Sequence, residues 1–309
     1  MTPPPSTLAM TSRHALRAAV FAVSVAGLAA CEVNLNTEGL SVRDTRTFTV
    51  AGTPELSLAT FDGSIEVHSW DRPEIEVEIE KRAMDQALLE QITVAVEQQG
   101  DRVQVTVTGP SRAESRGITV GVHISPSARL RVAMPRRATL TARTDDGAIR
   151  VEAIEGRLVL RSGDGSITGE RLAGEVEART DDGAIRFTGV EGALDLETGD
   201  GSVTVEGRPS RLRAESGDGG IRVRADDGTT LAGDWDIVTR DGSVTLTLPE
   251  TFAAEIDAET GDGSIRSSHP GLAADRDDRE RLRELRARIG AGGPTIRVRT
   301  GDGSIRFER

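Results

Sequence analysis

The chain has 309 residues, with 38 Lys and Arg against 50 Asp and Glu, and a net charge of −12. One Cys excludes an internal disulfide, and four His leave little material for a His-rich metal centre. The acidic balance argues against nucleic-acid binding, and an aromatic content of 3% leaves few platforms on which bases or sugars could stack.

The first element in chain order is an apolar run from Ala18 to Ala30, preceded by Arg13 and Arg17. A basic stretch followed by a short apolar run is typical of a secretory signal peptide, which we place at residues 1–30. The run is too short to cross a bilayer as a helix.

The apolar run ends in LAAC, with the sole Cys at position 31. This ending resembles the lipobox of bacterial lipoproteins, in which the Cys is the lipidated first residue of the mature chain. The resemblance implies that Cys31 is lipidated and that the chain is anchored in the cell envelope on the extracytoplasmic side of a membrane. A plain signal peptide with an incidental Cys is the alternative. Residues 31–46 are expected to form a short polar tether.

Residues 47–120 contain runs in which apolar and polar residues alternate, which predicts β-strands. We interpret this region as a β-rich N-terminal cap or as the first coils of the following body. One short helix is expected from about Met84 to Ile92. Gln99 and Gly100 lie between two alternating runs and predict a hairpin turn.

A repeated hexamer dominates the remaining sequence: Thr or Ser, any residue, Asp, Gly, a small residue, and Ile or Val. It recurs nine times, and repeats of this kind are typical of solenoids. The Asp and Gly of the nine copies, which we interpret as structural turn residues, are Asp62 and Gly63, Asp146 and Gly147, Asp164 and Gly165, Asp182 and Gly183, Asp200 and Gly201, Asp218 and Gly219, Asp241 and Gly242, Asp262 and Gly263, and Asp302 and Gly303.

The copies from Asp146 to Asp218 follow one another at intervals of 18 residues, and apolar residues occupy every second place on both sides of each turn. Such units are too small to bury their own apolar faces, so they must stack on their neighbours. The sequence therefore predicts an all-β fold over residues 121–309, a single-stranded β-solenoid with coils of about 18 residues. A meander of hairpins is the rival arrangement, because each Asp-Gly could also be a tight hairpin turn.

The T-x-D-G-x-I repeats, led by GVHISPSARLRVAMP at residues 121–135, resemble the bacterial "putative adhesin" family of unknown function. The resemblance is strong over residues 121–309 and weak over residues 46–120. It implies a β-solenoid outside the cytoplasm. It implies no established activity and no site residues.

The Asp-Gly pairs have two interpretations. In the structural one, Gly supplies a positive φ, Asp forms an Asx-type hydrogen bond, and the Thr or Ser two places earlier binds a free backbone N–H. In the functional one, the carboxylates hold Ca²⁺ between coils. Because only the Asp is constant as a potential ligand, we expect structural turns, no metal and no cofactor. Four places after the Asp, arginine and threonine alternate at Arg150, Thr168, Arg186, Thr204, Arg222 and Thr245, which would keep Arg from facing Arg if the coils stack in order.

Residues 268–293 interrupt the repeats. Leu282, Leu285 and Ile289 recur at helical spacing among dense charges, which predicts an amphipathic helix in this insertion. It would lie on the solenoid or bind a partner. The chain then ends at Arg309 with no evident cap, so either this helix covers the last coil or the open edge is a docking surface.

No motif of a hydrolase, a zinc protease or a nucleotide-binding loop is present. His68, His123 and His269 are expected to be surface residues, and Trp70 and Trp235 to be packing residues. The sequence therefore predicts a non-enzymatic envelope lipoprotein whose rigid solenoid is a surface for adhesion or for contact with a protein or an envelope polymer. A carbohydrate-active β-helix enzyme and a Ca²⁺-binding scaffold are the alternatives.

Overall fold

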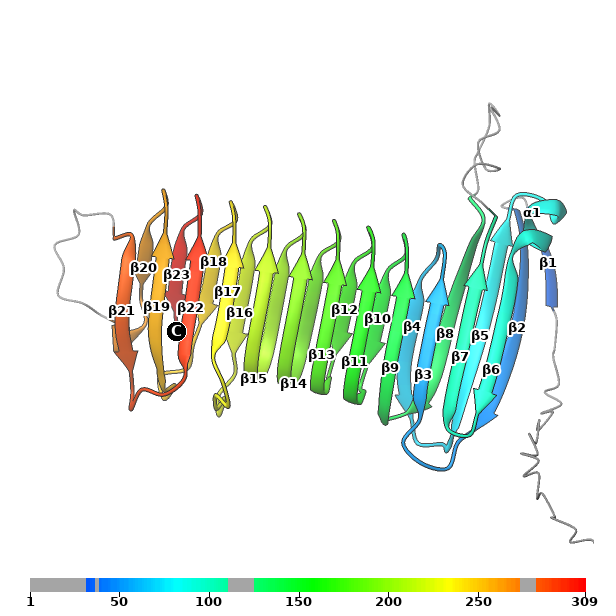
Figure 1. The fold of residues 1–309 in the computed structure, drawn as a ribbon, viewed down its shortest axis with the longest axis horizontal. Helices are drawn as coiled ribbons and strands as arrows, with labels where there is room; N and C mark the ends of the chain where they lie inside the picture. Colours follow the sequence, from blue (N-terminus) through cyan, green and yellow to red (C-terminus); the bar gives the residue numbers. More distant parts are fainter. Residues whose placement is uncertain (1–31, 37–38, 111–124, 273–281) are drawn as a thin grey trace, which may run out of the picture.

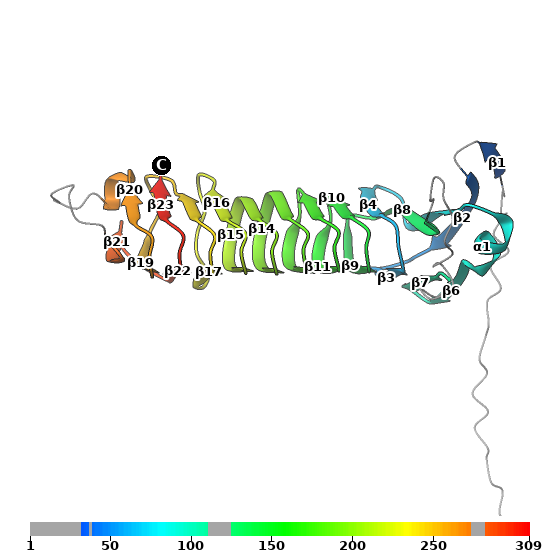
Figure 2. The same cartoon turned by 90° about the horizontal axis from the view of Figure 1, so that it is seen from above.

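The computed structural model of the chain describes residues 32–36, 39–110, 125–272 and 282–309. In these residues the protein is an elongated, solenoid-like all-β body in which two long ladders of strands run side by side (Figures 1 and 2). The core lies between the ladders, because alternate residues of the strands are buried.

The first ladder carries the short strands that follow most Asp-Gly pairs, extended at the N-terminal end by longer antiparallel strands. In spatial order its members are β1 (Glu32–Asn36), β2 (Gly39–Thr49), β5 (Glu74–Ala83), β8 (Ser127–Pro135), β4 (Ile65–Trp70), β10 (Ile149–Glu152), β12 (Ile167–Glu170), the first part of β14 (Ile185–Thr198), the first part of β15 (Val203–Ser216), β16 (Ile221–Ala225), β18 (Val244–Thr247), β23 (Ile305–Glu308) and β20 (Ile265–Ser267).

The second ladder carries the strands that lead into the Asp-Gly pairs. In spatial order its members are β6 (Thr93–Gln99), β7 (Arg102–Thr108), β3 (Glu55–Thr60), β9 (Arg137–Thr144), β11 (Glu155–Ser162), β13 (Ala173–Thr180), the later parts of β14 and β15, β17 (Trp235–Thr239), β22 (Thr295–Thr300), β19 (Ala254–Thr260) and β21 (Glu284–Ile289).

In the middle of the body, equivalent residues of successive repeats pair in parallel. Leu140 pairs with Leu158, Leu158 with Val176, and Val176 with Leu194, each 18 positions further along the chain. Parallel pairing requires the chain to go round between one strand and the next, so these strands form coils rather than hairpins. Each buried aliphatic side chain of this kind contributes about 1.5–3 kcal/mol to stability.

The order of the coils departs from the order of the sequence at the C-terminal end. β22 and β23, the last strands of the chain, pair with β17 and β18 on one side and with β19 and β20 on the other. The last repeat is therefore inserted between two earlier ones, which Figure 1 shows as red strands between yellow and orange ones. The expected open edge after Arg309 does not exist, because the final coil lies inside the stack.

The insertion forms a strand where the sequence predicts a helix. β21 pairs antiparallel with β19 and places Leu285 and Ile289 in the core. The apolar residues from Leu285 to Ile289 fit the two-residue period of a strand as well as the period of a helix. The strand forms because the edge of β19 offers unpaired backbone groups with which it can pair. The expected helix over residues 268–293 is wrong for this part; a 3₁₀ turn, η1 (Pro270–Leu272), precedes it, and residues 273–281 lie outside the described residues.

At the N-terminal end, too, the strands are not stacked in the order of the sequence. β3 and β4 pair with β9 and β10, while the later strands β7 and β8 lie on their outer side. α1 (Gln86–Gln91), within the stretch where a short helix is expected, joins the two ladders, and β6 and β7 form the expected hairpin at Gly100. The expected polar tether differs from the structure, because residues 32–36 and 39–49 are paired strands.

Candidate functional site

The Asp-Gly corners are held by the hydroxyl groups that precede them. Thr180 Oγ1 accepts a hydrogen bond from the Gly183 N–H at 3.2 Å and lies 2.8 Å from the Gly163 carbonyl oxygen and 3.0 Å from the Gly165 carbonyl oxygen. A hydroxyl donates one hydrogen bond and accepts others, so each Thr or Ser closes its own turn and ties it to the preceding coil. The same pair of contacts recurs at Thr144, Ser162, Thr198, Thr239, Thr260 and Thr300, and Ser216 makes the contact to the preceding coil.

The glycines of the corners are required by close approach between coils. A Cβ added to Gly147 would lie 1.9 Å from the Gly63 carbonyl oxygen, and one added to Gly165 would lie 2.0 Å from the Gly147 carbonyl oxygen. Of the nine motif glycines only Gly63 has a positive φ. The predicted positive φ is therefore wrong for the other eight. Glycine is required at these positions because the backbones of neighbouring coils approach too closely for a Cβ.

The aspartates of the corners are exposed, with Asp62 half-buried, and they form an acidic edge along the body. Asp218 and Asp262 lie 3.6 Å from the guanidinium groups of Arg240 and Arg283. The carboxylates of Asp164, Asp182, Asp200, Asp241 and Asp302 make no hydrogen bond or ion pair within the described residues, so the Asx-type bond expected for them is absent. No group of three or more potential metal ligands converges in the part of the chain that the structure describes.

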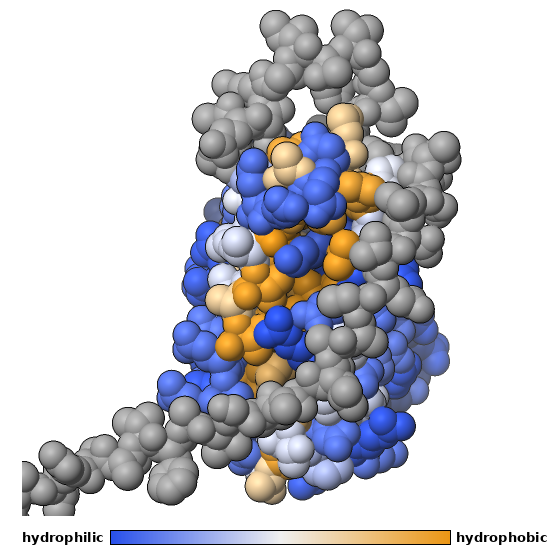
Figure 3. All heavy atoms as spheres, turned by 90° about the vertical axis from the view of Figure 1, so that its right-hand side faces the viewer, coloured by the Kyte–Doolittle hydropathy of each residue, from blue (hydrophilic) through white to orange (hydrophobic). Residues whose placement is uncertain are grey.

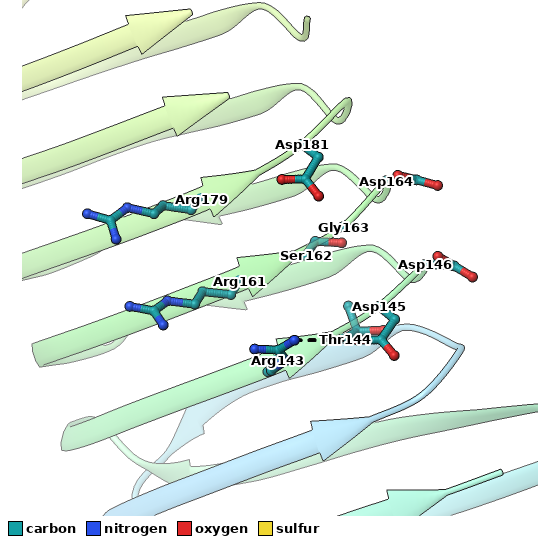
Figure 4. A pocket seen from close by; sticks show the side chains of 10 residues that line it. All are labelled: Arg143, Thr144, Asp145, Asp146, Arg161, Ser162, Gly163, Asp164, Arg179 and Asp181. Carbon is teal, nitrogen blue, oxygen red and sulfur yellow. Dashed lines mark ion pairs between the residues drawn. The ribbon is translucent and has the colours of Figure 1, made fainter. Parts of the chain in front are cut away.

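A shallow depression of about 430 Å³ crosses three coils beside this edge (Figure 4). Arg143, Arg161 and Arg179 stack in register along one wall, and Asp145 and Asp181 lie at the corner.

The arginines of the depression are neutralised unequally. Arg161 and Arg179 lie 2.9 and 3.2 Å from Glu177, and Arg179 also lies 3.1 Å from Glu197 on the next strand. Arg143 reaches only Asp145, at 3.8 Å. The hydrogen bond from Arg161 holds the pKa of Glu177 below its usual range. The depression is therefore lined by charges of both signs, which are paired within a coil and between coils.

The histidines and Trp235, which the sequence analysis singled out, do not lie together in the described residues. His68 is exposed on β4, and His123 lies outside the described residues. His269 is buried rather than on the surface as expected: the Gly271 N–H donates to its Nδ1, and its Nε2 lies 3.2 Å from the Pro249 carbonyl oxygen. Trp235 is fully buried with its ring 5.8 Å from that of Phe252.

The N-terminal end shows apolar surface between polar groups (Figure 3). At this end, partly buried side chains pack against the core from β2, α1 and β6: Leu40, Val42, Leu88, Val94 and Val96. Cys31 lies outside the described residues and directly precedes β1. No helix of the described residues is long and apolar enough to cross a membrane.

Two ladders of strands, stacked largely in parallel register around one core, define a solenoid-like all-β fold. The sequence model of the family described as "Toastrack DUF4097" matches residues 44–308, and the chain belongs to this family.

Solved structures are similar to this chain at low identity. A "putative adhesin" from Bacteroides fragilis NCTC 9343 is 13% identical over 86% of this chain and 96% of that one, with a TM-score of 0.46. A "putative adhesin" from Parabacteroides distasonis ATCC 8503 is 12% identical over the same shares, with a TM-score of 0.42. One from Parabacteroides merdae ATCC 43184 has 12% identity, the same coverage and a TM-score of 0.41. No curated protein matches the chain.

Proposed function

We propose that this protein is a non-enzymatic cell-envelope lipoprotein, anchored through Cys31, whose solenoid serves as a rigid surface for adhesion or for contact with a protein or envelope polymer. The observation that carries the proposal is the arrangement of the polar side chains, which stand in straight exposed ladders instead of converging in a groove. A scaffold that presents the same backbone position every coil suits an extended partner.

The contacts at the Asp-Gly corners support a structural role for the repeated hexamer. The hydroxyl and glycine contacts between coils account for its Thr or Ser and for its Gly without a ligand. Calcium binding predicts that millimolar Ca²⁺ raises the melting temperature of the protein, whereas structural corners predict no shift beyond that seen with Mg²⁺.

A carbohydrate-active enzyme that hydrolyses glycosidic bonds usually uses a carboxylic acid with a raised pKa as its general acid. Every carboxyl group of the described residues with a resolved shift has a lowered pKa, and the cause lies in hydrogen bonds and arginine charges: Glu80, Glu177, Asp234 and Asp257. A catalytic acid is expected to have a raised pKa. This pattern favours a scaffold over a carbohydrate-active enzyme.

Anchoring is tested by growing cells that express the full chain with a labelled fatty acid. Label on the wild-type protein, and release of Cys31→Ser from the membrane fraction, are the expected results. Two or more acyl chains make anchoring effectively permanent, so the difference should be nearly complete. An unlabelled wild-type chain, or a Cys31→Ser chain that stays in the membrane fraction, contradicts the proposed anchor.

A further inference from the structure

The first ladder carries a straight row of exposed arginines on its outer face. Arg186 pairs in register with Thr204, which pairs with Arg222; Thr245 follows, and then Arg306 and Arg266. We call Arg186, Arg222, Arg306 and Arg266 the arginine row. The sequence shows the first part of this alternation, but the insertion of the last coil brings Arg306 next to Thr245.

The arginine row lacks carboxylate partners. None of its four side chains forms an ion pair or a hydrogen bond within the described residues, and all four are exposed. Most arginines of the second ladder are paired, as Arg161 is with Glu177 at 2.9 Å and Arg297 with Asp234 at 2.9 Å. Arg211 is the exception there.

The local charge of this face opposes that of the chain. Arg224, which also has no partner, adds a fifth cation next to the row, whereas Glu206 and Glu308 are the carboxylates on the outer face of these strands. The corner aspartates Asp218 and Asp262 make their ion pairs with Arg240 and Arg283, which lie outside this ladder. On the outer face of these strands, five cations against two anions form a positive strip beside the acidic edge of the corner aspartates, on a protein with a net charge of −12.

Keeping these charges unpaired costs stability. Arg306 and Arg266 are neighbours in register on adjacent strands, where like charges raise the electrostatic energy. An anionic ligand would reverse the sign of this energy.

The spacing of the row fits a stiff, linear ligand. From Arg186 to Arg306, guanidinium groups recur on every second coil, about 9.6 Å apart along the axis. Thr204 and Thr245 lie lower between them, Thr204 being 8% exposed, and offer hydroxyl groups at the base of the row. The strip is straight because parallel strands keep it in register, so a chain lying along the axis could contact every arginine at once.

We propose that the arginine row binds a linear anionic polysaccharide, with carboxylate, sulfate or phosphate groups on the guanidinium groups and sugar hydroxyls against the threonines. The inference rests on the proposed function, whose polymer partner it specifies. No aromatic side chain lies on the outer face of the strands that carry the row, so binding depends on charge and weakens with salt.

The test measures binding of the full chain, purified in detergent micelles, to immobilised polygalacturonate and dextran sulfate, with neutral dextran and polyglutamate beside them. The row variant carries Arg186→Gln, Arg222→Gln and Arg306→Gln. The matched control carries Arg161→Gln, Arg213→Gln and Arg297→Gln, which makes the same change in net charge on the second ladder. Thermal unfolding of both variants checks that they remain folded.

We expect binding to the two anionic glycans and not to dextran, at least a tenfold loss in the row variant, and less than a threefold loss in the control. The salt dependence should also become shallower in the row variant. Equal losses in both variants, or no binding to either anionic glycan at low salt, overturn the proposal. Stronger row-dependent binding to polyglutamate overturns the polysaccharide as ligand in favour of an acidic peptide. Labelling of Cys31 is independent of these outcomes, so failure here is distinguishable from failure of the anchor.

Discussion

The regular middle of the protein and its two ends bury the same kind of apolar face by different means. In the middle, residues 137–216 stack in the order of the sequence, each strand parallel to the next. The ends use antiparallel strands, a helix and coils taken out of order. Parallel stacking can continue without limit but leaves a bare strand edge wherever it stops, so the ends must be built differently.

The two regions also differ in what fixes their polar groups. In the middle, hydroxyls and glycines repeat identical backbone contacts. At the N-terminal end, Glu80 is almost completely buried against Arg43 and Arg82, at 3.3 and 3.4 Å. The comparison predicts that a substitution in the middle disturbs the coils on both of its sides, whereas a substitution at an end disturbs the coil on one side only.

The largest effect is expected from Gly183→Ala in the middle of the stack. Its Cβ would lie 2.2 Å from the Gly165 carbonyl oxygen, and neither backbone can move without opening the ladder. We expect a loss of about 3 kcal/mol, measured by denaturant unfolding. The control is Gly100→Ala, which has a positive φ and open space around it and should cost about 1 kcal/mol. Equal costs would contradict the close-approach account.

The next effect tests the C-terminal end. Leu285→Ala removes a buried side chain of β21 and should cost about 2 kcal/mol, mostly by loosening this strand from β19. Hydrogen exchange should rise in β19 and stay unchanged in β13, because solenoid coils contact only their neighbours. Arg286→Ala, on the outer face of β21, is the control and should change little. Faster hydrogen exchange throughout the body would show that the effect of Leu285→Ala is not confined to the C-terminal end.

A smaller effect is expected when the hydroxyl group of one corner is removed. Thr180→Val keeps the shape of the side chain but leaves the buried Gly183 N–H without its acceptor. We expect a cost of about 1–2 kcal/mol, read as a shift in the denaturant midpoint. Thr188→Val, whose hydroxyl makes no hydrogen bond within the described residues, should be nearly neutral. If both variants lose the same stability, the hydroxyl ladder does not hold the coils.

The smallest effect concerns pH and the N-terminal end. Burial alone would raise the pKa of Glu80, but the hydrogen bond from Ser41 and the charges of Arg82 and Arg43 outweigh it, so its pKa lies below the ordinary value of a glutamate. A lowered folded pKa stabilises the protein above the unfolded value, and this stabilisation is lost as the pH falls through the folded value.

Glu80→Gln should therefore cost about 1 kcal/mol at pH 7 and much less near pH 3, measured from melting temperatures across this range. Glu97→Gln, on the exposed face of β6, is the matched control and should show no such dependence. A Glu80→Gln cost that stays constant with pH would mean that the charge of Glu80 is not what stabilises this end.

Much of the fold follows from local pattern. The alternation around each Asp-Gly pair predicts the buried ladders, and Leu140, Leu158 and Val176 occupy the core as expected. The helix of residues 86–91 and the hairpin at Gly100 also follow from local signals. The role of the corner glycines does not, because their constraint comes from the backbone of another coil and not from their own φ.

The candidate site is predicted only in part. The sequence shows the alternation of arginine and threonine as far as Thr245, but it does not show that Arg306 and Arg266 continue the row. The stack of Arg143, Arg161 and Arg179 follows from the 18-residue spacing. Its ion pairs between coils, Arg161 with Glu177 and Arg179 with Glu197, depend on the orientation of side chains on neighbouring strands.

The sequence by itself determined that this protein builds turns from nine copies of one hexamer and buries alternate residues on both sides of each. Only the tertiary structure decided which copies lie side by side. TGDGSI at residues 260–265 and at residues 300–305 is the same hexamer, so no local preference distinguishes their neighbours. The free edges at both ends decide instead, because an unpaired strand edge is satisfied only when a later segment returns to cover it.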